Sequence, residues 1–372
     1  MCETAKNIQY LTVLDPAHSM VRFISPGDDT AVSRFSSFVR EHPNSHFLQL
    51  PCWASVKEKW DWRGIAVYRG GKMTGAMSVL IRRLPLGCCL FYAPRGPVCD
   101  RNDGAVLSLL LQGAKELARQ EKAVLLFADP DEPDTNGEFR SIMEHLGFRE
   151  RQSDDFGNIQ AQHVMRLSLS GRTEAEIFES FCPKTRYNIR LAQRRGVQIR
   201  KFSGGAVPEE ELDSFTVLME ATGRRDHFCI RNRDYFSRVF TAFGTDAVLF
   251  MAYVEGKPIA GTIGIFSGGK GWYLYGASAN EHRNAMPNYL LQWEMLRHAL
   301  ALRCRFYDFR GVPGRLSEKD PLYGLYRFKK GFSGDYLKLT GLFTYPFRPV
   351  LARCALLLLK FRGRLRGTCV HP

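Results

Sequence analysis

The chain has 372 residues, of which 45% are hydrophobic and 12% aromatic. This apolar content supports two packed domains and excludes a wholly disordered protein. Lys and Arg outnumber Asp and Glu by 52 to 38, which gives a net charge of +14. Such a charge favours a polyanionic partner, such as RNA, a nucleotide diphosphate or an acidic membrane surface.

Residues 1–20 lack the basic start and long apolar stretch of a secretory signal. The ten cysteines form no C-x-x-C pair, and most lie in apolar runs, which favours free thiols in a reducing compartment. The apolar segment 349–361 is interrupted by Arg353 and is shorter than the roughly 20 residues that span a bilayer. We therefore expect a cytoplasmic protein without a spanning helix.

A block of the sequence occurs twice, and its first copy lies in the first half of the chain. An apolar strand there reaches a turn at Gly71-Lys72 and a second strand leaves it, as in a β-hairpin. A strand at 88–93, a helix with Asp103 as its cap and a strand at 123–129 are predicted to follow.

The second copy repeats this order around the turn Gly256-Lys257. A strand at 271–276, a helix with Pro287 in its first turn and a strand at 306–310 are predicted to follow. Hairpin, strand, helix and strand in this order predict an α/β fold with a mixed sheet and a crossover helix.

The repeat predicts two domains, at 20–168 and 169–348, and a basic tail at 349–372. In the tail, basic residues follow a leucine run: Lys360, Arg362, Arg364 and Arg366. This composition is typical of an amphipathic helix on anionic lipid. A terminal helix docked on the core is the other interpretation.

Residues 182–201 hold seven basic residues and no acid. These are Lys184, Arg186, Arg190, Arg194, Arg195, Arg200 and Lys201. Unopposed positive charges attract phosphate strongly at low salt, which favours a phosphate-bearing partner. A solvated helix face where the domains join is the other interpretation.

Metal chemistry finds little support in the sequence. His42 and His46 are four residues apart, but Pro43 between them argues against one shared helix face. No G-x-S-x-G, Walker or G-x-G-x-x-G sequence follows a predicted strand. We expect no metal site.

The repeated order of elements is that of GNAT-class acyltransferases, so we expect two tandem GNAT-like domains. These enzymes hold the pyrophosphate of coenzyme A at a turn before the crossover helix. Here Met286 and Pro287 add bulk and remove an N–H donor at that turn. Coenzyme A is therefore disfavoured as the acyl donor.

Seven segments in series resemble the FemABX family. They are FLQLPCWASVK (47–57), APRGPV (93–98), ADP (128–130), PKTRYNIR (183–190), PNYLLQWE (287–294), YDFRG (307–311) and LYRFKKGF (325–332). They occur in the family's order, and no long heptad-patterned insertion interrupts the second half, so the resemblance is to the shorter members. The family has two GNAT-like domains and transfers an amino acid from aminoacyl-tRNA to an amine of a peptidoglycan precursor.

The resemblance implies catalytic roles for three residues. Lys329 would face the oxyanion of the tetrahedral intermediate, with Phe328 packing the site; a surface lysine in a basic stretch is the other interpretation. Asp129 is the family's candidate carboxylate, either a general base or a structural cap. Because an aminoacyl ester is already activated, the reaction needs neither a metal nor a redox cofactor.

The resemblance also implies four residues that bind the precursor. Lys57, Arg231 and Tyr235 would hold its phosphates. Arg231 and Tyr235 are four apart, a spacing that would place both on one helix face. Tyr275 would line the precursor groove, although a core strand tyrosine is the other interpretation.

The resemblance therefore implies a tRNA-dependent aminoacyltransferase for interpeptide bridges of peptidoglycan. It would move Gly, Ala or Ser to UDP-MurNAc-pentapeptide or lipid II, as a monomer in the cytoplasm with peripheral contact at the inner face of the plasma membrane. The basic segment 184–201 would then be a candidate tRNA contact, through Lys184, Arg186, Arg190, Arg194 and Arg195. Two alternatives stay open: an acyl-CoA N-acyltransferase with the same fold, and a non-catalytic protein that binds RNA or membrane.

Overall fold

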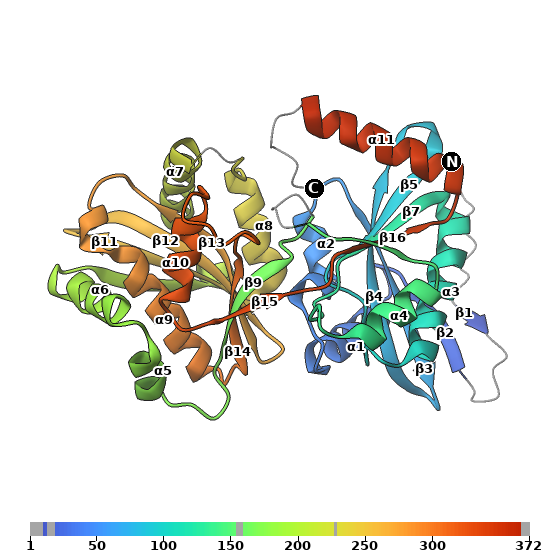
Figure 1. Ribbon diagram of the computed structural model, residues 1–372, viewed down its shortest axis with the longest axis horizontal. Coiled ribbons are helices and arrows are strands. Elements are labelled where there is room, and N and C mark those ends of the chain that lie inside the picture. The colour runs from blue at the N-terminus through green and yellow to red at the C-terminus, as the bar shows by residue number, and fades with distance from the viewer. Residues whose placement is uncertain (1–9, 13–18, 154–158, 227–228, 366–372) are drawn as a thin grey trace. The chain divides into compact units, whose positions relative to one another are not determined.

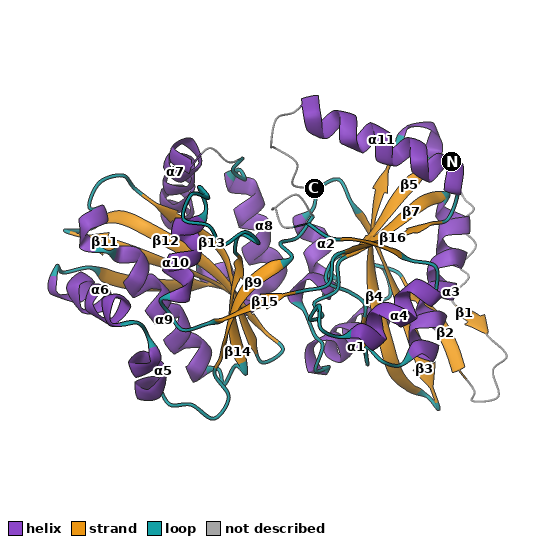
Figure 2. Ribbon diagram, viewed as in Figure 1, coloured by secondary structure: helices purple, strands orange, loops and turns teal. Residues whose placement is uncertain are grey.

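The computed structural model describes residues 10–12, 19–153, 159–226 and 229–365. The chain forms two compact units, the first from Met1–Gln152 with Leu339–Arg362 and the second from Ser153–Lys338 with Gly363–Pro372. Each unit is an α/β structure in which helices cover a sheet (Figures 1 and 2).

The first unit is built on a mixed sheet whose described strands follow the order β1-β2-β3-β4-β5-β7-β16-β8, with β6 paired to β4. The strands are β1 (Tyr10–Thr12), β2 (Ser19–Ile24), β3 (Asp61–Arg69), β4 (Lys72–Arg83), β5 (Cys89–Ala93), β6 (Val98–Cys99), β7 (Ala123–Ala128), β8 (Arg149–Arg151) and β16 (Leu342–Pro346). Strands β5 and β7 are parallel. A parallel pair needs a crossover connection, and helix α3 (Gly104–Glu121) provides it.

Helices α1 (Asp29–Glu41) and α3 cover opposite faces of this sheet. A Cβ atom on Gly64 would meet Phe35 of α1, whereas Gly113 of α3 lies against Ile65. Gly64 and Ile65 are neighbours on β3, and neighbouring strand residues point to opposite faces. The other helices of this unit are α2 (Cys52–Val56), α4 (Gly137–His145) and α11 (Pro349–Leu365).

The second unit has a mixed sheet whose described strands follow the order β10-β11-β12-β13-β14-β9-β15. They are β9 (His163–Ser168), β10 (Gln198–Ser203), β11 (Ala247–Val254), β12 (Lys257–Ser267), β13 (Lys270–Ser278), β14 (Phe306–Gly311) and β15 (Asp335–Lys338). Strands β13 and β14 are parallel, and helix α9 (Pro287–Ala301) connects them.

Helices α7 (Glu209–Asp226) and α9 cover opposite faces of the second sheet. A Cβ atom on Gly261 would meet Phe215 of α7, whereas Thr262 Oγ1 lies 3.1 Å from Met295 Sδ of α9. The other helices are α5 (Glu174–Ser180), α6 (Pro183–Arg194), α8 (Arg233–Phe243) and α10 (Tyr323–Lys330).

The predicted repeat is confirmed in both units. Each hairpin turn contains a glycine with positive φ, Gly71 at +77° and Gly256 at +76°, a conformation that glycine adopts without steric cost. Asp103 accepts the backbone N–H of Val106 at 3.0 Å and caps α3, as predicted. Pro287 is the first residue of α9, also as predicted.

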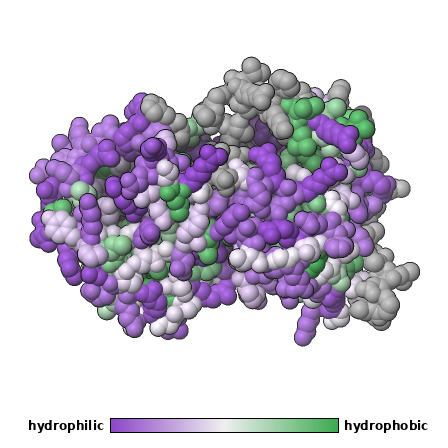
Figure 3. Space-filling model, viewed as in Figure 1, coloured by the Kyte–Doolittle hydropathy of each residue, from purple (hydrophilic) through white to green (hydrophobic). Residues whose placement is uncertain are grey.

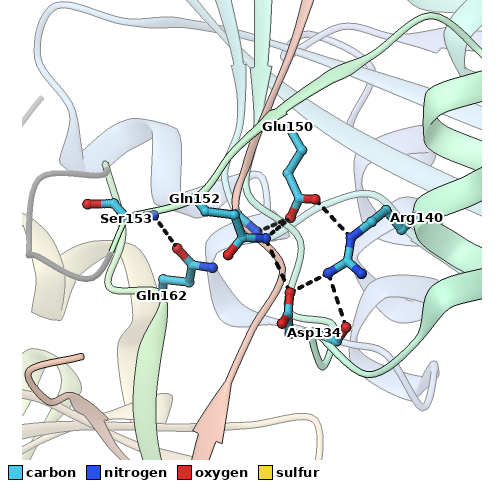
Figure 4. Close-up of polar contacts among 7 residues, drawn as sticks. Asp134, Arg140, Glu150, Gln152, Ser153 and Gln162 are labelled. Carbon is cyan, nitrogen blue, oxygen red and sulfur yellow. Dashed lines mark hydrogen bonds and ion pairs between the residues drawn. The ribbon is translucent and has the colours of Figure 1, made fainter. Parts of the chain in front are cut away.

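The boundaries of the units differ from the predicted domains. Residues 163–168 form β9, which pairs with β14 and β15 of the second unit. The chain then returns, and β16 pairs with both β7 and β8 of the first unit. Glu150 on β8 accepts a hydrogen bond from Arg140 Nε at 2.9 Å (Figure 4). Glu150 also accepts one from the backbone N–H of Gly341, just before β16, at 2.6 Å. Pairing between such distant segments leaves no local pattern in the sequence.

Helix α11 forms where the basic tail was predicted, and the side chains of Lys360, Arg362, Arg364 and Arg366 fall outside the described residues. In the described part of the chain, no helix combines the length and apolarity needed to cross a membrane. Free thiols are present at Cys52, Cys88, Cys89, Cys99, Cys182, Cys304 and Cys354. Cys229 is disulfide-bonded, so the expectation of free thiols is wrong for this residue.

Candidate active site

Lys329 on α10 is a buried lysine, with 4% of its surface exposed. Its Nζ atom donates a hydrogen bond to the Gly311 carbonyl at 2.7 Å and lies 5.7 Å from the centroid of the Tyr273 ring. Burial lowers the pKa of Lys329 from 10.5 to about 7, while Asp308 acts to raise it and Arg310 to lower it further. Lys329 is therefore not a surface lysine, and a buried cation with such a shift is a candidate functional group.

Asp308 organises the end of β14 beside Lys329. Its Oδ2 atom accepts from Arg166 Nη2 at 2.8 Å and Nε at 3.2 Å, and its Oδ1 atom accepts the backbone N–H of Arg310 at 2.6 Å. Arg310 has a φ of +63°, so the strand turns between Asp308 and Gly311, where its pairing with β9 shifts register. This turn presents the Gly311 carbonyl to Lys329.

Asp308 and Arg310 lie in a segment that resembles the family, but no role was assigned to them or to Arg166 from the sequence. A signal was available, because Asp308 is a charged residue in a predicted strand. Asp308 is 3% exposed in a strand between aromatic neighbours. A carboxylate at such a position needs a charged or hydrogen-bonding partner.

Three of the residues proposed to bind the precursor, Arg231, Tyr235 and Tyr275, come together in the second unit. The Tyr275 hydroxyl donates to the Tyr235 hydroxyl at 3.0 Å, and Arg231 Cζ lies 5.0 Å from the centroid of the Tyr235 ring. Burial and then Tyr275 raise the pKa of Tyr235 well above 10, against the effect of Arg231 and Arg310. Tyr235 therefore stays a neutral phenol, and Arg310 acts electrostatically on both this group and Lys329.

The predicted geometry of the Arg231 and Tyr235 pair is wrong. Helix α8 begins at Arg233, and Asn232 is its cap, with a side-chain oxygen that accepts the Tyr235 N–H at 3.0 Å. Asparagine favours such a cap over a place inside a helix. Arg231 thus precedes the helix and reaches Tyr235 through its ring face instead of from the same helix face.

A pocket of about 160 Å³ opens at the N-terminal end of α9. Its lining residues are Ile259, Ser278, Ala279, Glu281, Arg283, Met286, Pro287, Asn288, Tyr289 and Phe328. Helix α9 has no side-chain cap at this end. Met286 and Pro287 were expected to crowd this position, but they line the pocket and leave space beside them. Phe328, predicted to pack the site, contributes to the wall and stacks edge-on against Tyr289, with ring centroids 5.0 Å apart.

The predicted basic segment forms α6 and the start of β10. Six of its seven cations are exposed: Lys184, Arg190, Arg194, Arg195, Arg200 and Lys201. Arg194 Cζ lies 5.6 Å from the ring centroid of Tyr187, which is 55% exposed. Arg186 differs, because it pairs with Glu179 at 3.4 Å and donates to the Phe181 carbonyl at 3.1 Å.

The basic helix begins beside the helix that carries Lys329. The Cys182 N–H, just before α6, donates to the Gly331 carbonyl, just after α10, at 2.9 Å. A Cβ atom on Gly331 would lie 2.4 Å from Thr185 Oγ1 on α6, so the two helix ends can approach this closely only with glycine at 331. The second unit therefore holds the basic segment, the pocket and Lys329 together.

Asp129 lies in the first unit, directly after β7, and is 3% exposed. Its Oδ2 atom accepts from the Tyr92 hydroxyl at 2.8 Å, and its Oδ1 atom accepts from the Arg95 N–H at 2.8 Å. Both donors stabilise the ionised carboxylate, which opposes the uptake of a proton by a general base. The contacts support the structural-cap interpretation of Asp129.

Lys57 also lies in the first unit, at the C-terminal end of α2. Its Nζ atom is 4.9 Å from the centroid of the Trp53 ring, a cation–π contact that holds the half-buried side chain. Among the described residues, no group of three or more His, Cys, Asp or Glu side chains is arranged to hold a metal ion.

The two units, each with a hairpin, a strand, a crossover helix and a parallel strand, define a tandem GNAT-like α/β protein. A tandem GNAT protein from the clavulanic acid biosynthesis pathway shares this fold, with a TM-score of 0.53 at 14% identity over 88% of this chain and 98% of that chain. The FemAB family model matches residues 30–258 and 254–360. The chain therefore belongs to the FemAB family, which confirms the resemblance seen in the sequence.

Relatives and solved structures agree with this assignment. The chain is 31% identical over 373 residues to a lipid II:glycine glycyltransferase of Staphylococcus epidermidis, covering 81% of this chain and 88% of the relative. It is 30% identical over 378 residues to the protein of that name from Staphylococcus aureus, with the same coverage. The crystal structure of FemX superimposes with a TM-score of 0.79 at 27% identity, covering 87% of this chain and 98% of FemX.

Proposed function

We propose that the chain is an aminoacyltransferase that moves an amino acid, with glycine the first candidate, from aminoacyl-tRNA to an amine of a peptidoglycan precursor, with lipid II as the acceptor. The two staphylococcal relatives support glycine and lipid II, because their names state both. The observation that carries the chemistry is the buried Lys329 in the same unit as Arg231, Tyr235 and Tyr275.

In the proposed reaction, the precursor amine attacks the carbonyl carbon of the aminoacyl ester. A C–N bond forms, the ester C–O bond breaks, the amine loses a proton and the ribose oxygen leaves with one. The carbonyl oxygen carries negative charge in the tetrahedral intermediate, and a preorganised donor in a dry site stabilises that charge. Protonated Lys329 would be this donor, with its Nζ atom oriented by the Gly311 carbonyl.

The donor end of the reaction fits the pocket at α9. Phe328 lines this pocket and is adjacent in sequence to Lys329, so one helix would serve both the ester and the oxyanion. The exposed cations of α6 would bind tRNA phosphates, and Tyr187 beside Arg194 would offer a ring on which a base can stack. Arg186 would contribute less, because its guanidinium is already bound to Glu179.

The acceptor end would use the cluster at Tyr235. Arg231 supplies charge and the neutral Tyr235 and Tyr275 hydroxyls supply hydrogen bonds, a combination that suits a diphosphate. Lys57 of the first unit is proposed as a further phosphate ligand. Asp129 is not needed as a base in this scheme, since its carboxylate is engaged by Tyr92 and Arg95.

A transfer assay tests this function. The purified chain would be incubated with a mixture of charged tRNAs and either lipid II or UDP-MurNAc-pentapeptide, and the products weighed by mass spectrometry. We expect lipid II to gain the mass of glycyl residues, and ribonuclease to abolish the product. An acetylated product formed from acetyl-coenzyme A without tRNA would overturn the proposed donor, and the absence of any product would overturn the enzyme assignment.

A further inference from the structure

Helix α11 presents an apolar outer face on the first unit. The opposite side of the helix packs on the first unit, because Ala352 and Ala355 are buried. Just before the helix, Phe347 packs against Phe91 of β5, with ring centroids 5.7 Å apart. The outer face carries Val350 and Leu357, which are 73% and 55% exposed. Figure 3 shows green hydrophobic side chains gathered along the described part of this helix.

The exposed side chains have helical spacing. Val350, Cys354 and Leu357 are at positions i, i+4 and i+7, which lie on one face of an α-helix, and all three are exposed. Nine large hydrophobic side chains are exposed in the described part of the chain, and three of them, Val350, Leu351 and Leu357, fall within these eight residues. Such a concentration marks an interaction surface rather than scattered surface residues.

The charged residues of the C-terminal segment itself have one sign. Arg348, just before α11, and Arg353, in its second turn, are exposed. From Leu339 to the end of the sequence there are six basic residues and no Asp or Glu. The partner must therefore offer an apolar layer and negative charge at the same surface.

We propose that the outer face of α11, formed by Val350, Leu351, Arg353, Cys354 and Leu357, docks onto an anionic lipid bilayer. The helix would lie in the interface, with the leucine and valine side chains at the acyl boundary and the arginines among the headgroups. A second copy of the chain fits poorly, because two such helices would bring like charges together. RNA fits poorly too, because phosphates and sugars offer no apolar layer for Val350 and Leu357.

Vesicle cosedimentation tests the docking surface without using the transfer reaction. The full chain would be mixed with vesicles of phosphatidylglycerol and phosphatidylcholine, or of phosphatidylcholine alone. We expect binding to the anionic vesicles, weakening as salt is raised, because each arginine near an anionic surface contributes about fivefold to partitioning. Equal binding to both vesicle types, or no binding to either, would overturn the proposal.

Two variants locate the surface. The double variant Val350→Glu with Leu357→Glu should lose at least about tenfold in partitioning, because two exposed apolar anchors are replaced by like charges to the lipid. Leu302→Glu is the matched control, since Leu302 is 51% exposed in the second unit and should keep full binding. Equal loss in both variants would overturn the assignment to α11. Concentration-dependent dimers that disappear in the double variant, without vesicle binding by the parent chain, would assign this face to a second copy instead.

The outcome is separable from the proposed function. Vesicle binding by a chain that shows no transfer would leave the surface standing and remove the enzyme assignment. Transfer to soluble UDP-MurNAc-pentapeptide without vesicle binding would leave the enzyme assignment standing and remove the docking surface.

Discussion

The two units share one order of elements, yet the N-terminal ends of their crossover helices differ. In the first unit Asp103 caps α3 and is itself held by Arg69 Nη1 at 2.8 Å. In the second unit α9 starts at Pro287 without a side-chain cap, and the pocket opens there. In the first unit a carboxylate of the chain itself caps the helix, whereas in the second unit the helix end is uncapped beside the pocket. The same position of the repeat is therefore capped in one unit and uncapped in the other.

The aspartates at the ends of the parallel strands show a related difference. Asp129 after β7 uses both carboxylate oxygens on the adjacent turn and on Tyr92. Asp308 in β14 instead joins Arg166 to the turn that faces Lys329. The second unit is therefore where we expect substitutions to affect chemistry, and the first is where we expect them to affect stability.

The largest effect is expected for Lys329→Ala. Loss of the oxyanion donor should lower kcat by roughly 100- to 1,000-fold, with the affinity for the precursor nearly unchanged. Steady-state kinetics and precursor titration would measure the two quantities. Lys330→Ala is the matched control, because Lys330 is the exposed neighbour on the same helix and should keep its activity. Similar losses in both variants would contradict the role of Lys329.

Filling the pocket should have the next largest effect. Ala279→Phe places a ring in the space at α9 and should lower kcat/KM for the donor by roughly 10- to 100-fold through steric exclusion. The control, Ala105→Phe, adds the same ring to the exposed first turn of α3 and should leave kcat/KM unchanged. Unchanged donor kinetics in Ala279→Phe would show that the open helix end does not take the donor.

Arg231→Ala should weaken precursor binding about tenfold, or about 1.4 kcal/mol, because one charged hydrogen-bonding partner of the phosphates is lost. Titration calorimetry with UDP-MurNAc-pentapeptide would measure the dissociation constant. Arg224→Ala removes an exposed arginine of α7 and serves as the control. An unchanged affinity in Arg231→Ala would remove this residue from the precursor site.

A smaller effect is expected in the pH profile of kcat. The protonated form of Lys329 is the proposed active form, and its pKa is about 7, so activity should fall as pH rises through this value. Asp308 raises the pKa of Lys329 and Arg310 lowers it. Asp308→Asn should therefore move the alkaline limb to lower pH, and Arg310→Gln should move it to higher pH. Shifts in the same direction for both variants would contradict this coupling.

The smallest effect on activity is expected for the capped helix of the first unit. Asp103→Ala removes the cap of α3 and should lower the free energy of unfolding of the first unit by about 1 kcal/mol. Urea denaturation would measure the change, and kcat should stay at the parent value. A loss of transfer at full stability would mean that this helix end also takes part in the reaction.

Local patterns were enough to predict much of the fold. The two hairpins, the Asp103 cap, the Pro287 start and the crossover helices depend on neighbouring residues, and all were confirmed. Strand β16 was missed because its pairing joins residues almost 200 positions apart, such as Arg151 and Leu342. Contacts over such distances are decided by tertiary packing, which hydrophobic periodicity does not report.

The family motifs named candidate site residues whose roles stay predictions. Lys329, Arg231, Tyr235 and Tyr275 were named from the sequence, and the structure places all four in one unit. The capping role of Asn232 is a local signal of the same kind as Asp103, and it was overlooked. The contact between Arg166 and Asp308 could not be derived, because it joins residues 142 positions apart that become buried together.

The return of the chain into the first sheet has a consequence for synthesis. Residues 342–346 emerge from the ribosome only after residues 153–338, which carry the strands of the second sheet, yet they form β16 between β7 and β8. The first unit therefore has an incomplete sheet until β16 is synthesised, whereas the sheet of the second unit can form before then. Premature termination near the end of translation would consequently damage the portion of the protein that was made first.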